Sequence, residues 1–289
     1  MQGILLLKII VADYGKRATS WIICPVPSFY AQFSSPLAQY MTKAISFSAS
    51  SGIHQGDRES QQDRVSLFRN MREPNCLLAI VADGMGGLTG GRKAADQVML
   101  TADQLFRSFN SKTDNSQQLI ERIALDAHMV IGLTAMASTE QPHTTYASFV
   151  VTSTGACHWA HVGDSRIYHY RNALLVHRSS DHSYVQSMVD NKEITPAQAV
   201  NHPKSNILTQ CLGSKTTPKV THHSIAKLHS GDVVMACSDG VWPYFSDTEM
   251  GAILENCNPR EATELIITTA RSRSRKRGDN LSIAIVKYT

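Results

Sequence analysis

Four short runs of β-type residues follow one another in the middle of this chain, with only a few residues between each run and the next. They are Tyr146–Thr152, Cys157–Val162, Arg166–Tyr170 and Leu174–His177. Several short strands at such close spacing are typical of an antiparallel sheet. This stretch therefore predicts antiparallel strands at the centre of the fold.

The rest of the chain mixes apolar strand runs with helical spacing. Further buried strands are predicted at 77–82, 233–237 and 281–286. Helices are predicted at 92–109, at 117–136, near 247–256 and from Pro259 to about Arg271. A capping box of Ser246 and Glu249 is expected to begin the third of these helices. Strands and helices do not alternate regularly, so the order predicts a mixed α+β fold instead of a doubly wound one.

Composition limits the classes of protein this chain can belong to. Its 289 residues are 42% hydrophobic and 18% charged, which suits one large domain with a substantial core and argues against global disorder. The 28 basic and 24 acidic residues give a net charge of +4, which is too weak to indicate a nucleic-acid partner. We therefore expect a globular protein that does not bind nucleic acid.

The cysteines and the N-terminus bear on the compartment. The six cysteines include no Cys-x-x-Cys pair and are expected to be mostly buried thiols in a reducing compartment. The apolar start of the chain has no basic segment ahead of it, is interrupted by Lys8 and is too short to span a bilayer. We predict a cytoplasmic protein without a membrane span, with a signal peptide as the alternative. Residues 1–45 carry no usable motif and are treated as an N-terminal extension of unknown role, ahead of a domain at 46–289.

Three aspartates share one local setting. Asp83, Asp239 and Asp279 each stand beside a glycine or a tight turn at the end or start of an apolar strand. A single Asp-Gly is most simply a turn. A strand end, however, holds a carboxylate rigidly, and a neighbouring glycine lets a backbone carbonyl approach a ligand. Several converging carboxylates would repel each other unless a cation neutralised them, and such hard oxygen ligands select Mg²⁺ or Mn²⁺.

Several further motifs accompany these aspartates along the chain. They are Gly56–Asp63, Ala82–Gly87, Thr144-Thr145, His161–Tyr168, Asp181–Ser183, His202–Gly213, Gly231-Asp232 with Cys237–Gly240, and Gly278–Asn280. In this order, from about Ser51 to Tyr288, the chain resembles the type 2C, metal-dependent serine/threonine protein phosphatases, particularly the bacterial forms. The resemblance implies a four-layer α-β-β-α sandwich of two antiparallel sheets flanked by helices. The metals would lie between the sheets at one edge, beside a flap at about residues 181–213.

The resemblance also implies a role for each site residue. Asp83 would bridge two metal ions, with the backbone carbonyl of Gly84 on one of them. Asp239 and Asp279 would complete the protein ligands of the other ion. Arg58 would grip the phosphate of the substrate.

Two more aspartates receive outer roles from the resemblance. Asp63 would hold metal-bound water without binding a metal itself. Asp164 would serve a third, weaker metal together with Asp239. The implied cofactors are thus two Mn²⁺ or Mg²⁺ ions, with room for a third.

The implied activity is hydrolysis of phosphoserine and phosphothreonine in proteins by metal-activated water. The expected partners are phosphorylated proteins that a serine/threonine kinase supplies, and the enzyme is expected to be a monomer. Two alternatives stay open: a catalytically weak phosphopeptide-binding regulatory module of the same fold, and a phosphatase for small phosphorylated metabolites.

Some positions depart from the family's pattern. Gln62 stands where many members have glutamate, which removes one carboxylate near the second metal. Met85 stands where eukaryotic relatives have a histidine proposed to protonate the leaving group. The basic run Arg271–Arg277 directly precedes Asp279. Its cations either complement the dipole of a solvated helix end or attract acidic or multiply phosphorylated substrates.

Overall fold

The computed structural model describes residues 46–87, 89–136, 139–200 and 202–289. The expected extension at 1–45 lies outside the described residues, so its separation from a domain at 46–289 stays a prediction. Every strand pair within the two large sheets described below is antiparallel.

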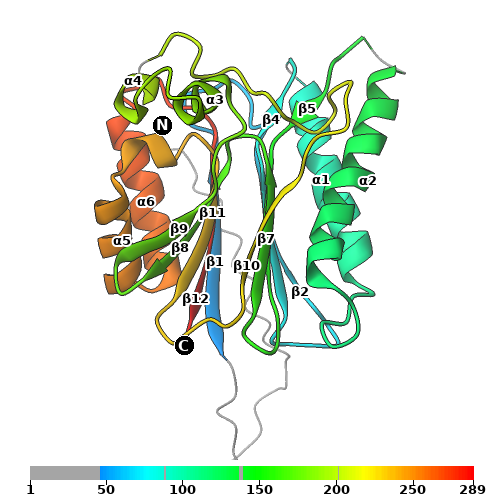
Figure 1. The fold of residues 1–289 in the computed structure, drawn as a ribbon, viewed down its shortest axis with the longest axis vertical. Helices are drawn as coiled ribbons and strands as arrows, with labels where there is room; N and C mark the ends of the chain where they lie inside the picture. The colour runs from blue at the N-terminus through cyan, green and yellow to red at the C-terminus, as the bar shows by residue number, and fades with distance from the viewer. Residues whose placement is uncertain (1–45, 88, 137–138, 201) are drawn as a thin grey trace, which may run out of the picture. The chain divides into compact units, whose positions relative to one another are not determined.

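Two five-stranded sheets face each other (Figure 1). The first has the strand order β1 (Phe47–His54), β12 (Leu281–Tyr288), β11 (Val233–Cys237), β8 (Arg166–Arg171), β9 (Leu174–Arg178). The second has the order β10 (Thr221–Ile225), β7 (Cys157–Val162), β6 (Tyr146–Val151), β3 (Leu77–Ala82), β2 (Arg64–Arg69). A small third ladder joins β4 (Gly84–Met85) to β5 (His143–Thr144).

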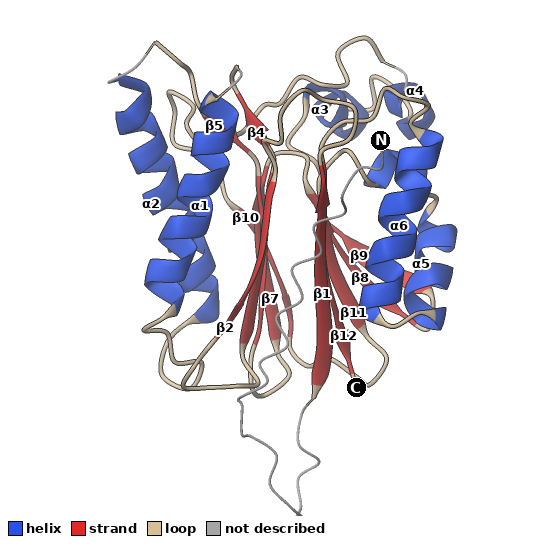
Figure 2. Ribbon diagram, turned by 180° about the vertical axis from the view of Figure 1, so that it is seen from behind, coloured by secondary structure: helices blue, strands red, loops and turns tan. Residues whose placement is uncertain are grey.

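Helices cover the outer face of each sheet, which gives the predicted four-layer α-β-β-α sandwich (Figures 1 and 2). The second sheet is covered by α1 (Gly90–Phe106) and α2 (Ser116–Met136), and the first by α5 (Asp247–Asn256) and α6 (Pro259–Arg273). The flap segment contains the short helices α3 (Tyr184–Asp190) and α4 (Pro196–Val200). A 3₁₀ turn, η2 (Trp242–Tyr244), follows β11.

The alternation of side chains along β3 explains the layering. Leu78, Ile80 and Ala82 point into the cluster beneath α1 and α2. Leu77, Ala79 and Val81 point into the cluster between the two sheets. Because successive strand residues face opposite sides, a strand buried on both faces reads as an unbroken apolar run. A third cluster lies between the first sheet and the helices α5 and α6.

The predicted strands and helices are present, with two differences. Strands β1, β2 and β10 were not predicted, and neither were the two-residue strands β4 and β5. The first three lie at the edges of their sheets, are half-buried and include polar residues. The capping box of Ser246 and Glu249 is only half formed. The Ser246 hydroxyl accepts from the Glu249 amide at 3.1 Å, but the Glu249 carboxylate pairs with Arg273 instead of returning to the cap. The reciprocal box lies at Asn258 and Glu261, ahead of α6.

Two further predictions concern membranes and thiols. Within the described part of the chain, no helix has the length and apolar character needed to cross a membrane. The five cysteines of that part are free thiols, and Cys76, Cys157 and Cys237 are buried. Cys24 lies outside the described residues.

Candidate metal centre

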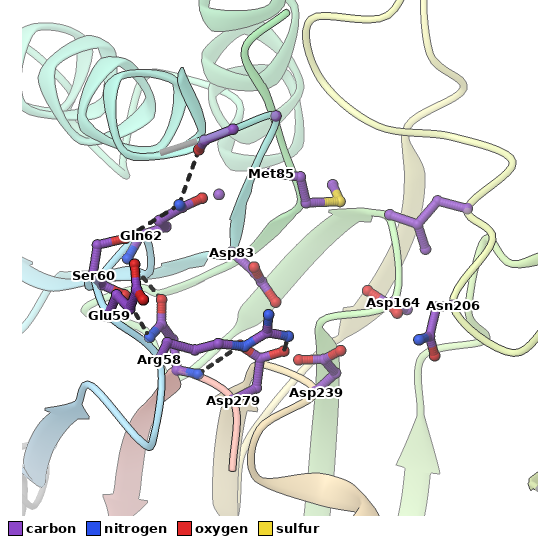
Figure 3. A pocket seen from close by; sticks show the side chains of 15 residues that line it. Arg58, Glu59, Ser60, Gln62, Asp83, Met85, Asp164, Asn206, Asp239 and Asp279 are labelled. Carbon is purple, nitrogen blue, oxygen red and sulfur yellow. Dashed lines mark hydrogen bonds and ion pairs between the residues drawn. The ribbon is translucent and has the colours of Figure 1, made fainter. Parts of the chain in front are cut away.

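A pocket of about 600 Å³ opens at the end of the sandwich where both sheets carry the predicted aspartates. Its lining includes six of the seven predicted site residues: Arg58, Asp83, Gly84, Asp164, Asp239 and Asp279. Figure 3 shows the carboxylates of Asp83, Asp239 and Asp279 turned toward the same part of this pocket. The seventh residue, Asp63, does not line the pocket and is fully buried.

Each sheet contributes two of the four aspartates that line the pocket. Asp83 follows β3 and Asp164 lies two residues after β7, both in the second sheet. Asp239 lies two residues after β11, and Asp279 lies two residues before β12, both in the first sheet. The aspartates therefore meet because the sheets face each other, although up to 196 positions separate them in the sequence.

The backbone of Asp83 is held on both sides. Its amide donates to the hydroxyl of Thr145 at 2.9 Å, and its carbonyl accepts from the Thr145 amide and the Thr144 hydroxyl, each at 2.8 Å. The next residue must be glycine, because a Cβ on Gly84 would lie 2.3 Å from the carbonyl oxygen of Gly91. The Thr-Thr pair, to which sequence reasoning gave no role, thus fixes the position of Asp83.

Asp63 lies between the sheets. One carboxylate oxygen, Oδ2, accepts from Ser238 at 2.8 Å and from Ser282 at 2.7 Å. The other, Oδ1, has no hydrogen-bond partner among the described residues. Burial raises the pKa of this carboxyl, and the neighbouring charge of Asp239 raises it further.

The same physical cause acts on the carboxylates of the pocket. Burial, followed by the charges of Asp63 and Asp239, raises the pKa of Asp83 well above its ordinary value. Burial raises the pKa of Asp164 and of Asp239 as well, with neighbouring aspartates adding to the effect. Ionised carboxylates at this density repel each other, so a cation stabilises the arrangement.

Arg58 is the one cationic side chain in the described lining of the pocket. Its guanidinium lies 2.5 Å from the Oδ2 atom of Asp279. Its side chain is nevertheless 63% exposed, because it stands at the rim. A group this exposed can exchange Asp279 for an incoming anion.

The donor set suits a hard divalent cation. Buried oxygens Oδ1 of Asp63 and Asp239 have no hydrogen-bond partner among the described residues, and neither imidazole nor thiolate lines the described pocket. Carboxylate and carbonyl oxygens are the ligands of Mg²⁺ and Mn²⁺. Within the described ranges, no three carboxylate, imidazole or thiolate groups are already gathered closely enough to enclose an ion. Water and substrate oxygens would therefore have to complete the coordination, as is usual for Mg²⁺.

Asn280 organises the loop that carries Arg58. Its side-chain amide donates to the carbonyls of Gln55 at 2.8 Å and Ser60 at 3.0 Å, and its Oδ1 accepts from the Gln62 amide at 2.7 Å. The side chain of Asn280 is buried. In the sequence, Asn280 stands out only as part of the Gly278–Asn280 motif, and its adjacency to Asp279 is the one signal of its role.

The side-chain amide of Gln62 donates two hydrogen bonds. The Nε2 atom donates to the carbonyl of Gly87 at 3.0 Å and to the hydroxyl of Ser60 at 3.3 Å. An ionised glutamate at this position could only accept hydrogen bonds. The departure from the family's pattern therefore ties the glycine turn beside the pocket to the Arg58 loop.

The flap segment reaches the pocket through Asn206 and Leu208, which belong to its lining. Figure 3 shows Asn206 near Asp164. The amide of Tyr184 donates to the carbonyl of Ile207 at 2.8 Å, which joins the two ends of the segment. Asn206 belonged to a recognised motif, but its position in the pocket was not predicted.

The start of the flap is anchored beside Asp164. The guanidinium of Arg166 forms two hydrogen bonds of 2.8 Å with the carboxylate of Asp181 and lies 3.4 Å from the centroid of the Trp242 ring. The indole of Trp242 donates to the carbonyl of Asp164 at 3.2 Å. One stacked cation thus connects the flap, η2 and the loop of Asp164.

Four aspartates at the strand ends of two facing sheets, with one arginine at the rim, define the class of this site: a hard-cation centre open to an anionic substrate. The protein-family model described as Protein phosphatase 2C matches residues 52–270. This match spans most of the chain. The chain therefore belongs to the protein phosphatase 2C family.

Individual relatives agree with this assignment. The serine/threonine phosphatase stp of Listeria monocytogenes is 30% identical over 244 residues, which cover 80% of this chain and 91% of the relative. The protein phosphatase PhpP of Streptococcus pneumoniae is 28% identical over 234 residues, with 79% and 92% covered.

Solved structures share the fold. The serine/threonine phosphatase of S. agalactiae superposes with a TM-score of 0.73 at 26% identity, covering 84% of this chain and 99% of that chain. The catalytic domain of the serine/threonine protein phosphatase PstP in complex with two manganese ions superposes with a TM-score of 0.71 at 22% identity, covering 85% and 99%. The four-layer architecture implied by the sequence is thus the architecture of this family.

Proposed function

We propose that this chain is a protein serine/threonine phosphatase that hydrolyses phosphoserine and phosphothreonine with water activated at a centre of two Mn²⁺ or Mg²⁺ ions. The observation that carries the proposal is the meeting of four aspartates from both sheets in one pocket, with Arg58 at its rim. Family membership supports the same activity.

The proposed metal ligands follow the resemblance. Asp83 would bridge two ions, and the carbonyl of Gly84 would bind one of them. Asp239 and Asp279 would hold the other ion, and Asp164 would serve a third, weaker site with Asp239. When bound, two such ions lower the pKa of a shared water and neutralise charge that develops at phosphorus.

The other residues position the reactants. Arg58 would exchange Asp279 for two phosphate oxygens, because its planar fork matches them and its side chain is exposed. Asp63, fixed by Ser238 and Ser282, would hold a water molecule through its unpartnered Oδ1 without binding a metal itself. Met85 lines the pocket but carries no proton to donate, so the leaving alkoxide would take its proton from water.

Release of phosphate from phosphothreonine peptides tests the proposal. The wild type should be active with Mn²⁺ and inactive in EDTA, and Asp239→Asn should lose at least about a hundredfold in kcat. Asp103→Asn is the matched control, because it removes an exposed carboxylate of α1 outside the pocket. Activity that survives both EDTA and Asp239→Asn would overturn the two-metal mechanism.

The same assay separates the alternatives. A phosphopeptide-binding module without turnover is not favoured, because the relatives are named phosphatases. A phosphatase for small metabolites would hydrolyse a phosphorylated sugar faster than the peptide. We propose phosphoproteins as substrates, supplied by a serine/threonine kinase, and a monomeric cytoplasmic enzyme whose catalytic domain spans 46–289 behind an extension at 1–45.

A further inference from the structure

We infer that Arg275, Lys276 and Arg277, here called the basic turn, bind acidic residues that flank the phosphorylated residue of the substrate. The inference rests on the proposed function and adds a preference within it. The basic turn joins α6 to Asp279, so it lies in the chain directly before a residue of the pocket.

The five cations of the run 271–277 divide into two groups. Arg271 forms an ion pair with Asp57 at 2.9 Å, and Arg273 forms one with Glu249 at 2.5 Å. The three residues of the basic turn are all exposed, and among the described residues none of them forms an ion pair. Only these three are therefore available to an external anion.

The helix dipole does not account for the basic turn. α6 ends at Arg273, and its last turn already contains Arg271 and Arg273. The favourable effect of a cation on the dipole falls off within that last turn. The remaining three cations lie beyond the helix, so the hypothesis of a solvated helix end explains only the first group.

The backbone of the basic turn is held in an unusual conformation. Arg275 and Lys276 have φ values of 51° and 65°, in the left-handed region that residues other than glycine rarely adopt. The amide of Arg277 donates to the carbonyl of Ser274 at 3.1 Å. Strain of this kind persists only where surrounding contacts hold it, and it is frequent at binding sites.

Asp57 supplies the contacts that hold the end of the turn. Its carboxylate accepts from the amide of Gly278 at 2.8 Å, and its own amide donates to the carbonyl of Gly278 at 2.9 Å. A Cβ on Gly278 would lie 2.7 Å from the hydroxyl oxygen of Ser274. The three cations are thus presented from a fixed turn instead of a loose loop.

Chain geometry places the basic turn within reach of a bound peptide. Arg277 is two residues from Asp279, so their Cα atoms are at most about 7 Å apart. An extended peptide advances about 3.3 Å per residue. Side chains two or three positions from a phosphorylated residue at the pocket are therefore at a matching distance.

Charge gives the turn its selectivity. The described lining of the pocket contains five carboxylates, including Glu59, and a single guanidinium. Metal ions held by the aspartates would neutralise much of this negative charge, and an acidic peptide would then be attracted to any unpaired cations beside the pocket. The basic turn supplies such cations on the Asp279 side, so a substrate with acidic flanking residues is the one that fits.

Three phosphothreonine peptides test the inference: one with glutamates two and three positions from the phosphothreonine, one with glutamines there, and one with lysines. The wild type with Mn²⁺ should show the highest kcat/KM for the glutamate peptide, by about tenfold over the glutamine peptide at low salt. The combined variant Arg275→Gln, Lys276→Gln, Arg277→Gln should bring this ratio close to one.

A charge-matched control removes three other exposed cations. Arg69→Gln, Arg72→Gln, Lys112→Gln makes the same change in net charge with none of the three residues in the pocket lining. If the basic turn itself binds the acidic residues, this control should keep the wild-type ratio. If net charge alone steered the peptides, the ratio would fall equally in both variants. An equal ratio in the wild type, or an equal fall in both variants, would overturn the inference.

Failure of the proposed function would look different, because none of the three peptides would then be hydrolysed. Binding still decides the inference in that case. Fluorescence anisotropy with peptides that carry the non-hydrolysable phosphonate analogue of phosphothreonine should give the same preference for glutamates in the wild type and its loss in the basic-turn variant. Equal affinities of the wild type for the glutamate and glutamine analogues would contradict it.

Discussion

The side chain of Asn280 accepts a 2.7 Å hydrogen bond from the backbone amide of Gln62, across 218 positions of sequence. Its amide group also donates to the carbonyls of Gln55 and Ser60. Arg58 lies between those two residues in the chain. One buried asparagine beside Asp279 thus fixes the loop from which the phosphate-binding arginine is expected to act.

Asn280→Ala should destabilise the fold and loosen this loop together. Loss of these hydrogen bonds, with buried backbone groups left unpaired, should lower the free energy of unfolding by about 2–3 kcal/mol. KM for phosphothreonine peptides should rise more than kcat falls, because Arg58 loses its position and the aspartates of the pocket remain. Urea unfolding and steady-state kinetics measure both effects. Asn256→Ala, which removes an exposed amide on α5, serves as the control, and equal effects in the two variants would refute the role of Asn280.

Removal of metal should make stability depend on pH. Burial raises the pKa of Asp239 to about 6, of Asp63 to about 7 and of Asp164 to about 8, against 3.8 for an ordinary aspartate. A carboxyl whose pKa is higher in the folded state stabilises the fold when protonated, and this stability is lost as pH rises through the folded pKa. In EDTA, the melting temperature should therefore fall between about pH 5 and pH 8 relative to the same protein with saturating Mn²⁺.

Comparison with and without Mn²⁺ at each pH removes the contribution of groups outside the site. Asp164→Asn should reduce the EDTA-specific fall at the upper end of the range, since Asp164 has the highest of the three pKa values. A difference between the two melting curves that stays constant across this range would contradict the prediction.

The predictable parts of the fold are those that depend on local sequence. β3, β11 and β12 are buried on both faces, so each reads as an apolar run. β1 and β10 lie at sheet edges and carry serine and histidine, so no alternation marks them. One half of the capping box predicted at Ser246 is absent, because the carboxylate of Glu249 forms an ion pair with the distant Arg273.

The residues of the site also divide into those that a local sequence signal marks and those whose role depends on distant partners. A strand end beside a glycine is a local signal, and it located Asp83, Asp239 and Asp279. The functions of Thr145 and Asn280 depend on partners 62 and 218 positions away. The antiparallel pairing of β3 with β6 within the second sheet creates the first contact, and the facing of the two sheets creates the second. No property of the neighbouring sequence could reveal either one.

Gln62→Glu should lower the stability of the fold and raise its affinity for metal. The substitution removes the donor to the carbonyl of Gly87 and sets a carboxylate against that oxygen, which should lower the free energy of unfolding in EDTA by about 1–3 kcal/mol. The added charge beside the pocket should lower the Mn²⁺ concentration that gives half-maximal activity by about three- to tenfold.

Metal titration of activity and urea unfolding in EDTA measure the two effects. Gln62→Met, which removes the donor without adding charge, should reproduce only the loss of stability; an unchanged Mn²⁺ requirement in Gln62→Glu would contradict the electrostatic argument.

Asp181→Asn should disconnect the flap from the loop of Asp164. The side chains of Arg166 and Asp181 are 17% and 10% exposed, so the substitution leaves a guanidinium largely buried without its counter-ion. Breaking a buried pair from one side costs about 3–5 kcal/mol, and we expect the lower end because the stack on Trp242 remains. Activity on peptides should fall more than activity on a small aryl phosphate, because a larger substrate would make more contact with the flap residues Asn206 and Leu208, which line the pocket. Asp103→Asn breaks an exposed pair with Arg107 and should cost less than about 1 kcal/mol. Equal losses of stability in the two variants, or equal losses on both substrates, would show that the Arg166–Asp181 pair does not anchor the flap.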